Sequence, residues 1–114
     1  MTNIEIILPI TDVQTIHTEF FWWKRHMKND NPLVSIEKRY PQLSYFITIC
    51  NITLQITPKH EYYKFIFSHI EASQLIVDLK YMVDIPPTLL AFCQKLELRV
   101  NNKITIPYYA YKKS

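Results

Sequence analysis

Four histidines are the side chains best suited to acid–base chemistry or metal binding: His17, His26, His60 and His69. No two of them stand at helical i, i+4 spacing or as His-x-His, so their spacing does not predict a metal site. His60, His69 and Lys64 could form the acid–base set of a metal-independent ribonuclease if the fold brought them together. Nothing in their spacing requires this, so a ribonuclease is the second alternative interpretation.

The two cysteines, Cys50 and Cys93, both lie within apolar stretches. Two cysteines at this separation predict neither a disulfide framework nor a zinc site. A thiolate is costly to form in apolar surroundings, so neither cysteine is expected to act as a nucleophile. We expect two reduced thiols packed as small hydrophobic side chains, with no metal and no cofactor.

Aromatic and basic residues are interleaved in two places, a pattern that suits binding more than catalysis. These are residues 22–28, Trp-Trp-Lys-Arg-His-Met-Lys, and residues 108–113, Tyr-Tyr-Ala-Tyr-Lys-Lys. Such clusters can bind a single nucleic-acid strand through charge and stacking. Tryptophan, tyrosine and arginine are also common anchors of protein interfaces. The residues expected to contact a protein partner are Phe21, Trp22, Arg25, Lys28, Tyr108 and Tyr111.

The sequence of 114 residues contains no glycine, although average usage would give about eight. Glycine provides the backbone turns of phosphate-binding loops and nucleophile elbows. Its absence lowers the odds of motif-based enzymes and favours function through side-chain surfaces. Asparagine can adopt the positive φ angles of turns instead, and the candidates are Asn29 or Asn31, Asn51 and Asn101–Asn102.

Composition and charge limit the class of protein further. The chain is 48% hydrophobic and 20% charged with a net charge of +3, which describes a globular domain with a mild basic excess. A dedicated nucleic-acid binder usually shows a stronger and more clustered excess. The first apolar run follows no basic region, and no run reaches about 18 apolar residues. We therefore expect one domain, residues 1–114, in the cytoplasm and without a membrane span.

A strand and a long helix are expected to carry the first aromatic cluster. Alternating apolar residues predict a short strand over residues 4–8 that ends at Pro9. Thr11 or Asp12 is expected to cap a helix that runs to about residue 28. The expected buried stripe of this helix is Val13, Ile16, Phe20, Trp23 and Met27. Phe21 and Trp22 fall outside that stripe, unless a second layer covers them and makes them core residues.

Residues 33–57 have the alternation typical of strands. Apolar residues alternate over residues 43–49 and, in the opposite phase, over residues 52–56. A strand cannot change its buried face without a turn or bulge, which we place at Asn51. Alternation resumes over residues 61–68, which predicts a further strand.

The last third of the sequence predicts two helices and a hairpin. Ser68 and Glu71 form a capping box that opens a helix to about residue 83. A shorter helix is expected from Thr88 to about Lys95, preceded by Pro87, which suits a first helical turn. Residues 96–106 alternate around Asn101–Asn102, which predicts a closing hairpin.

Together these elements predict a single α+β domain. We expect an antiparallel β-meander of about five to seven strands, one long N-terminal helix, and one or two helices before the C-terminal hairpin. No internal repeat is apparent in the sequence. The expected function is a small non-enzymatic protein-binding module that covers a partner protein, as inhibitors, antitoxins and immunity proteins cover a toxin or effector enzyme. The first alternative is a single-stranded nucleic-acid-binding protein.

Overall fold

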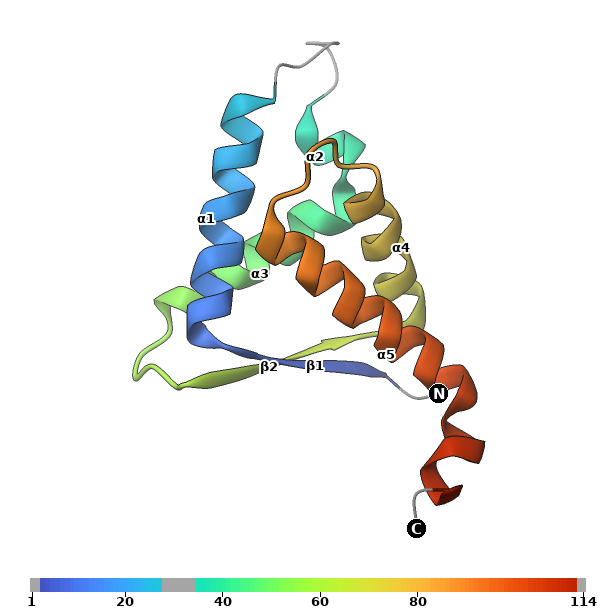
Figure 1. Cartoon of the computed structure of the whole chain (residues 1–114). Coiled ribbons are helices and arrows are strands. Elements are labelled where there is room, and N and C mark those ends of the chain that lie inside the picture. Colours follow the sequence, from blue (N-terminus) through green and yellow to red (C-terminus); the bar gives the residue numbers. More distant parts are fainter. Residues whose placement is uncertain (1–2, 28–34, 113–114) are drawn as a thin grey trace.

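The computed structural model describes the backbone of residues 3–27 and 35–112, and the side chains of residues 3–27 and 35–101. The elements are β1 (Ile4–Pro9), α1 (Ile10–His26), α2 (Ile36–Arg39), α3 (Pro41–Gln55), β2 (Tyr62–Phe67), α4 (His69–Lys80) and α5 (Pro87–Lys112). Figure 1 shows β1 and β2 as a two-stranded ribbon, with the long helices all standing on one side of it. None of the described helices is long and apolar enough to cross a membrane.

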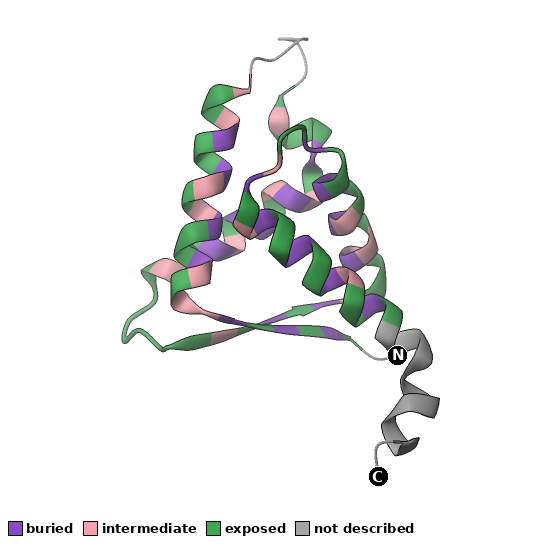
Figure 2. Cartoon of the chain, viewed as in Figure 1, coloured by how far each residue is buried: buried purple, intermediate pink, exposed green. Residues whose placement is uncertain are grey.

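The ribbon is antiparallel and has one covered face. Ile6 lies opposite Phe65 at its centre. Because successive side chains of a strand point to opposite faces, every second residue of β1 is buried, as are Phe65 and Phe67 of β2, while Tyr63 is partly buried (Figure 2). The exposed residues of the outer face are Glu5, Ile7, Tyr62, Lys64 and Ile66. In the part of the chain that the structure describes, neither outer edge of the ribbon pairs with a third strand.

The predicted meander of five to seven strands is wrong, because the described residues form two strands and five helices. Residues 41–55, predicted as strands with a turn at Asn51, form the single helix α3. Its buried side chains follow helical rather than alternate spacing: Leu43, Phe46, Ile47, Cys50 and Thr53. Of the alternating apolar residues, Leu43 and Ile47 belong to the helical stripe, whereas Tyr45 is exposed. Phe46 and Cys50, which lie between the alternating positions, complete the buried stripe and indicate the helical period.

The predicted C-terminal hairpin is also wrong, because residues 96–106 continue helix α5. The buried side chains of α5 again follow i, i+3, i+4 spacing: Leu89, Phe92, Cys93, Leu96 and Val100. Asn51 and Asn101 are therefore helical residues and not turns, while Asn29 and Asn31 lie outside the described residues. The positive φ angle found among the described residues is that of Asp84, at 55°, a residue type that tolerates this conformation.

Four local predictions are confirmed. The first strand and the strand before Ser68 are present, and the buried stripe of α1 includes Val13, Ile16, Phe20 and Trp23. The capping box of α4 is complete: Ser68 Oγ accepts from the N–H of Glu71 at 3.1 Å, and Glu71 Oε1 accepts from the N–H of Ser68 at 2.8 Å. The start of α1 differs from the prediction, because the helix begins at Ile10 and contains Thr11 and Asp12.

The structure contains an internal two-fold repeat that we did not detect in the sequence. The first repeat unit is β1, α1 and α3, and the second is β2, α4 and α5. Buried positions correspond in the first helices, where Val13, Ile16 and Phe20 match Ala72, Leu75 and Leu79. Trp23 of α1 matches the buried Met82, which lies just beyond the end of α4. Buried positions also correspond in the second helices, Leu43, Phe46, Ile47 and Cys50 matching Leu89, Phe92, Cys93 and Leu96. Helix α2 belongs to the longer connection of the first unit.

The strand pairing and the central ring stacking between the two units follow the same two-fold relation. The strands pair about Ile6 and Phe65, which are equivalent positions of the two units, so Ile4 pairs with Phe67 and Leu8 with Tyr63. Phe46 and Phe92 are also equivalent, and their rings stack with centroids 4.7 Å apart and planes 8° apart. A contact in which residue i meets j and j meets i is the pattern of a symmetric homodimer, here built within one chain.

Carboxylates from the first helices cap the second helices of the opposite units. Helices α3 and α5 both begin at a proline, Pro41 and Pro87. Asp78 Oδ2, on α4, accepts hydrogen bonds from the N–H groups of Gln42 and Leu43 at 2.9 Å each. Glu19 Oε1, on α1, accepts from the N–H groups of Thr88 and Leu89 at 3.0 Å each. Both carboxylates satisfy otherwise unpaired helix N–H groups and complement the helix dipole.

Candidate protein-binding surface

Helix α1 carries the surface predicted to contact a partner. Its buried stripe faces the other helices, and Phe21 and Trp22 are 41% and 52% exposed, so the alternative that they are core residues is wrong. At about 100° per residue, Arg25 projects between Phe21 and Trp22 when the helix is viewed along its axis. We call Phe21, Trp22, Arg25 and His26 the α1 aromatic face. Figure 1 shows α1 at the side of the molecule, with its outer surface uncovered by other elements.

Neighbours one turn away order both exposed aromatic rings. The Trp22 and His26 rings stack with centroids 4.4 Å apart and planes 27° apart. His26 Nδ1 lies 2.9 Å from the backbone oxygen of Trp22, so the tautomer with a proton on Nδ1 donates to that oxygen. The His17 ring is 4.8 Å from the Phe21 ring, and Lys24 Nζ is 5.9 Å from the Phe21 centroid. Ordered side chains lose less conformational entropy when a partner binds.

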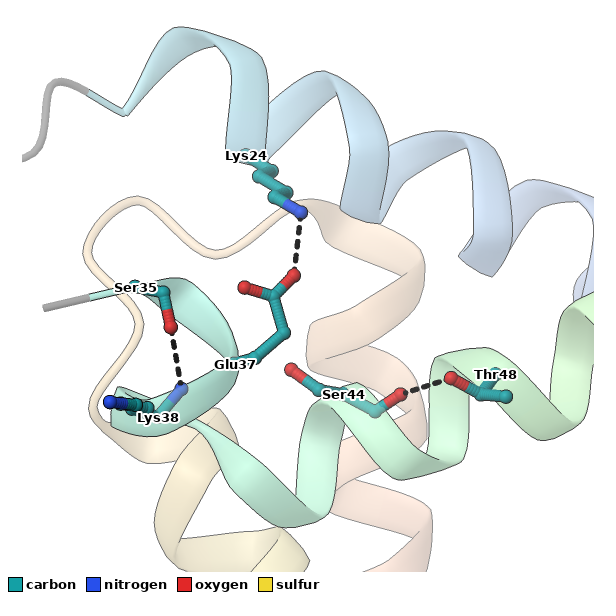
Figure 3. Close-up of polar contacts among 6 residues, drawn as sticks. All are labelled: Lys24, Ser35, Glu37, Lys38, Ser44 and Thr48. Atoms are coloured by element: carbon teal, nitrogen blue, oxygen red, sulfur yellow. Dashed lines mark hydrogen bonds and ion pairs between the residues drawn. The ribbon is translucent and has the colours of Figure 1, made fainter.

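The two cations beside these rings have different environments. Lys24 Nζ lies 2.7 Å from Glu37 Oε2 on α2, as Figure 3 shows. The hydrogen bond from Lys24 lowers the pKa of the Glu37 carboxyl. Arg25 is exposed and forms no ion pair within residues 3–27 and 35–101. Its guanidinium is therefore the charge of this face that is available to an acidic partner.

Three of the six predicted contact residues come together on this face, and the other three are not placed. Phe21, Trp22 and Arg25 share the outer surface of α1. Lys28 lies outside the described residues. Tyr108 and Tyr111 fall in the last turns of α5, and their side chains are outside the described ones.

The residues considered for ribonuclease chemistry do not converge. His60 precedes β2 and stands against Tyr63, with ring centroids 5.9 Å apart, whereas His69 is the first residue of α4. The six-residue strand that separates them spans roughly 20 Å. Lys64 lies on the outer face of the ribbon, with Nζ 3.7 Å from Glu5 Oε1. No acid–base pair at hydrogen-bond distance results from these three described residues.

Both cysteines are free and buried, as predicted. Burial raises the pKa of the Cys50 thiol to about 12 and also raises the pKa of Cys93. A thiol with a raised pKa is a poor nucleophile at neutral pH. Within the described residues, no group of three or more His, Cys, Asp or Glu side chains could hold a metal ion.

The structure also shows two grooves that the sequence analysis missed, one along each edge of the ribbon. The α5 groove, between β1 and α5, has a volume of about 570 Å³, and its lining includes Glu5, Ile7, Ala91, Lys95, Leu98 and Arg99. The α3 groove, between β2 and α3, has a volume of about 410 Å³, and its lining includes Tyr45, Ile49, Thr53, Ile56, Tyr63 and Ile66. Because α3 and the later part of α5 were interpreted as strands, their helix–strand grooves could not be anticipated.

Comparisons with protein-family models, curated proteins and solved structures found no significant match. The functional argument therefore depends on the residues of this chain.

Proposed function

We propose that this protein is a non-enzymatic protein-binding module that covers a surface of its partner with the α1 aromatic face. The observation that carries the proposal is the exposure of Trp22, at 52%, on a helix whose buried stripe is already complete. Only part of the Trp22 and Phe21 side chains packs against the rest of the protein, because about half of each is exposed. Their exposed area is available for an interface.

The energy available from this face is enough to anchor a complex. About half of the Trp22 side chain is exposed, so burying roughly 100 Å² of it would contribute about 2 kcal/mol. A few aromatic and arginine residues usually supply most of the binding energy of an interface. Stacking of Trp22 on His26 orders the anchor before binding.

Charge indicates the chemistry of the partner. Arg25 stands between the two exposed rings without an acidic neighbour among the described residues, and the whole chain carries a net charge of +3. An acidic patch that surrounds an apolar depression would complement this face, mainly through association rate and specificity. Within the class of inhibitors, antitoxins and immunity proteins, this chain suits a toxin or effector with an acidic surface rather than the basic cleft of a nuclease. We also propose a cytoplasmic location, where two free thiols stay reduced.

A capture experiment with matched variants tests the proposal. The tagged protein is used as bait in an extract of its source cells, beside Trp22→Ala and the control Tyr62→Ala, which removes an aromatic ring that is 61% exposed on the ribbon. We expect one protein to be recovered in stoichiometric amount with the wild type and with Tyr62→Ala, and to be lost with Trp22→Ala. Equal recovery with both folded variants, checked by circular dichroism, would contradict the assignment of Trp22.

Single-strand nucleic-acid binding is the second candidate, because the same face interleaves aromatic rings with cations. Stacked Trp22 and His26, with Arg25 beside them, could receive a base and a phosphate. This candidate predicts retention of a labelled oligonucleotide at about 50 mM salt and steep loss as salt rises. No retention of a single-stranded probe at low salt would exclude it. The ribonuclease alternative gains no geometric support, because His60 and His69 lie beyond opposite ends of β2.

A further inference from the structure

The two grooves beside the ribbon are equivalent under the internal two-fold relation, yet their chemistry differs. The α3 groove is lined by Tyr45, Ile49 and Thr53 of α3. The matching positions of α5, counted from the first proline of each helix, are Ala91, Lys95 and Arg99, which line the α5 groove. A large ring has been replaced by a methyl group, and two uncharged side chains by cations. At the strand position the difference has the opposite sign, because Glu5 lines the α5 groove where the equivalent Lys64 lines the α3 groove. The charged residues of the linings are Lys95, Arg99 and Glu5 in the α5 groove and Lys64 and Glu71 in the α3 groove, so the α5 groove is the more basic of the two and has the larger volume.

The acids near the α5 groove do not form ion pairs with its cations: Glu5 lies in the lining, and Asp12 lines an adjoining cavity together with Lys95. Lys95 and Arg99 are exposed, and neither forms an ion pair within residues 3–27 and 35–101. Glu5 is the acidic residue of the lining, and its Oε1 lies 3.7 Å from Lys64 Nζ. An anionic ligand in this groove would therefore meet two cations whose charge the described acids leave unpaired.

The opposite wall of the α5 groove is a strand edge. Within the described chain β1 pairs only with β2, so its other edge has no strand partner. An unpaired edge presents backbone N–H and C=O groups that can pair with an added strand. Ile7 and Leu98, which are 56% and 61% exposed, provide apolar surface beside that edge.

We propose that the α5 groove binds an acidic extended peptide segment of a partner protein, which adds to β1 as a third strand and places two carboxylates on Lys95 and Arg99. Residues four apart on a helix are separated by about 6 Å along its axis. Side chains two apart on a strand point the same way and are separated by nearly 7 Å. The recognised pattern is therefore acid-x-acid, with apolar residues between and beside the acids. This site is separate from the α1 aromatic face and does not depend on it.

The α3 groove serves as an internal comparison for this assignment. It borders the other edge of the same ribbon, but Tyr45 and Ile49 occupy the positions of Ala91 and Lys95. A peptide held by backbone pairing alone would have no reason to prefer either edge. A peptide held also by its carboxylates should prefer the α5 groove.

A titration followed by NMR tests the site in the whole chain. The probe is the peptide acetyl-Thr-Val-Glu-Val-Glu-Val-Thr-amide at about 50 mM salt, and the control peptide has Gln in place of both Glu residues. We expect saturable shifts of amide signals from residues 4–8 and 91–99, and about tenfold weaker binding of the control peptide, because two exposed charge contacts are lost. Equal affinity for the two peptides, or shifts confined to β2 and α3, would overturn the proposal.

Charge-reversal variants complete the test. Lys95→Glu with Arg99→Glu should weaken binding of the acidic peptide by at least about tenfold, and Lys95→Gln with Arg99→Gln provides a milder pair. Lys38→Glu with Lys59→Glu makes the same change of net charge at exposed residues outside the groove and should leave peptide binding unchanged. Equal loss with both reversed pairs would overturn the proposal. Displacement of the peptide by an oligonucleotide would overturn the proposal and assign the groove to nucleic acid. Shifts of the same amide signals without peptide, growing with protein concentration, would overturn it and assign the groove to a second copy of this chain.

Discussion

Two single carboxylates join the halves of this molecule at the level of individual residues. Asp78 accepts hydrogen bonds from two N–H groups of α3, and Glu19 accepts them from the equivalent N–H groups of α5. Asp78 is 8% exposed, and Glu19 is less deeply buried. Buried N–H groups that lose their acceptor pay the cost of desolvation without compensation. The contribution of each carboxylate to stability should therefore follow its burial.

Asp78→Ala is expected to lower the free energy of unfolding by about 2 kcal/mol, because it leaves the N–H groups of Gln42 and Leu43 without their acceptor. Glu19→Ala should cost about 1 kcal/mol for the equivalent change at a more exposed cap. Urea denaturation of the purified variants measures both values. Glu37→Ala, which removes an exposed ion pair with Lys24, is the control and should cost less than about 0.5 kcal/mol. Equal losses for Asp78→Ala and Glu37→Ala would show that the cap is not important.

The buried thiol of Cys50 makes stability depend on pH in the alkaline range. Its pKa in the folded state is about 12, whereas an unfolded thiol ionises near 8.5 to 9. Between these values the unfolded state binds fewer protons than the folded state, so stability is fully present below pH 8 and falls as pH rises. Between pH 8 and 10 this single group should remove roughly 1 to 2 kcal/mol. Denaturation of the wild type and of Cys50→Ala at both pH values isolates this contribution. An equal change in the free energy of unfolding of both proteins between pH 8 and 10 would contradict the prediction.

At the scale of secondary structure, the sequence was informative where local signals were strong and misleading where two periods overlapped. The capping box at Ser68 and the stripe of α1 were predicted because a few adjacent residues determine them. Helix α3 was missed because its residues 43, 45, 47 and 49 alternate, although Phe46 and Cys50 occupy the phase that a half-buried strand would leave polar. The ring contacts of Phe46 with Phe65 and Phe92 show that residues at even-numbered positions are buried as well as residues at odd-numbered positions.

Asn51 distinguishes the helix from the predicted turn. Asn51→Pro should destabilise the protein by about 3 kcal/mol, because proline removes a hydrogen bond from the interior of α3 and clashes with the preceding turn. A turn with positive φ at this position would also exclude proline but would accept glycine, whereas Asn51→Gly should destabilise a helix by up to about 1 kcal/mol relative to Asn51→Ala. Asn51→Ala is the matched variant and should be neutral or slightly stabilising, since alanine is the better helix former. Thermal unfolding followed by circular dichroism measures these effects, and tolerance of proline at residue 51 would contradict the helix.

The candidate site was predictable only in the part that one helix determines. Phe21, Trp22 and Arg25 could be assigned to a common face because helical period alone brings them together. The grooves depend on the pairing of β1 with β2 and on helices that pack from the opposite units. These long-range contacts leave no fixed spacing in the sequence.

At the scale of the whole molecule, the internal two-fold relation predicts that neither repeat unit is complete alone. Each lacks a partner strand for the ribbon and the carboxylate that caps its second helix. Fragments cut in the connection between Gln55 and Tyr62 should be poorly folded separately and should form a one-to-one complex when mixed. Circular dichroism and analytical ultracentrifugation measure the recovery of helix and the mass of the complex. Fragments that fold fully on their own would contradict the interdependence of the units.

The two repeat units can also be compared with each other, as two related sequences would be. Pro41, Leu43 and Phe46 have identical counterparts in Pro87, Leu89 and Phe92, and Ile7 has one in Ile66. Equivalent positions with the same residue in both units identify side chains that the fold requires. Equivalent positions with different residues, such as Ile49 and Lys95, identify where the two units differ in surface chemistry. Exchanging side chains between equivalent positions would therefore move a property from one edge of the ribbon to the other within an unchanged framework.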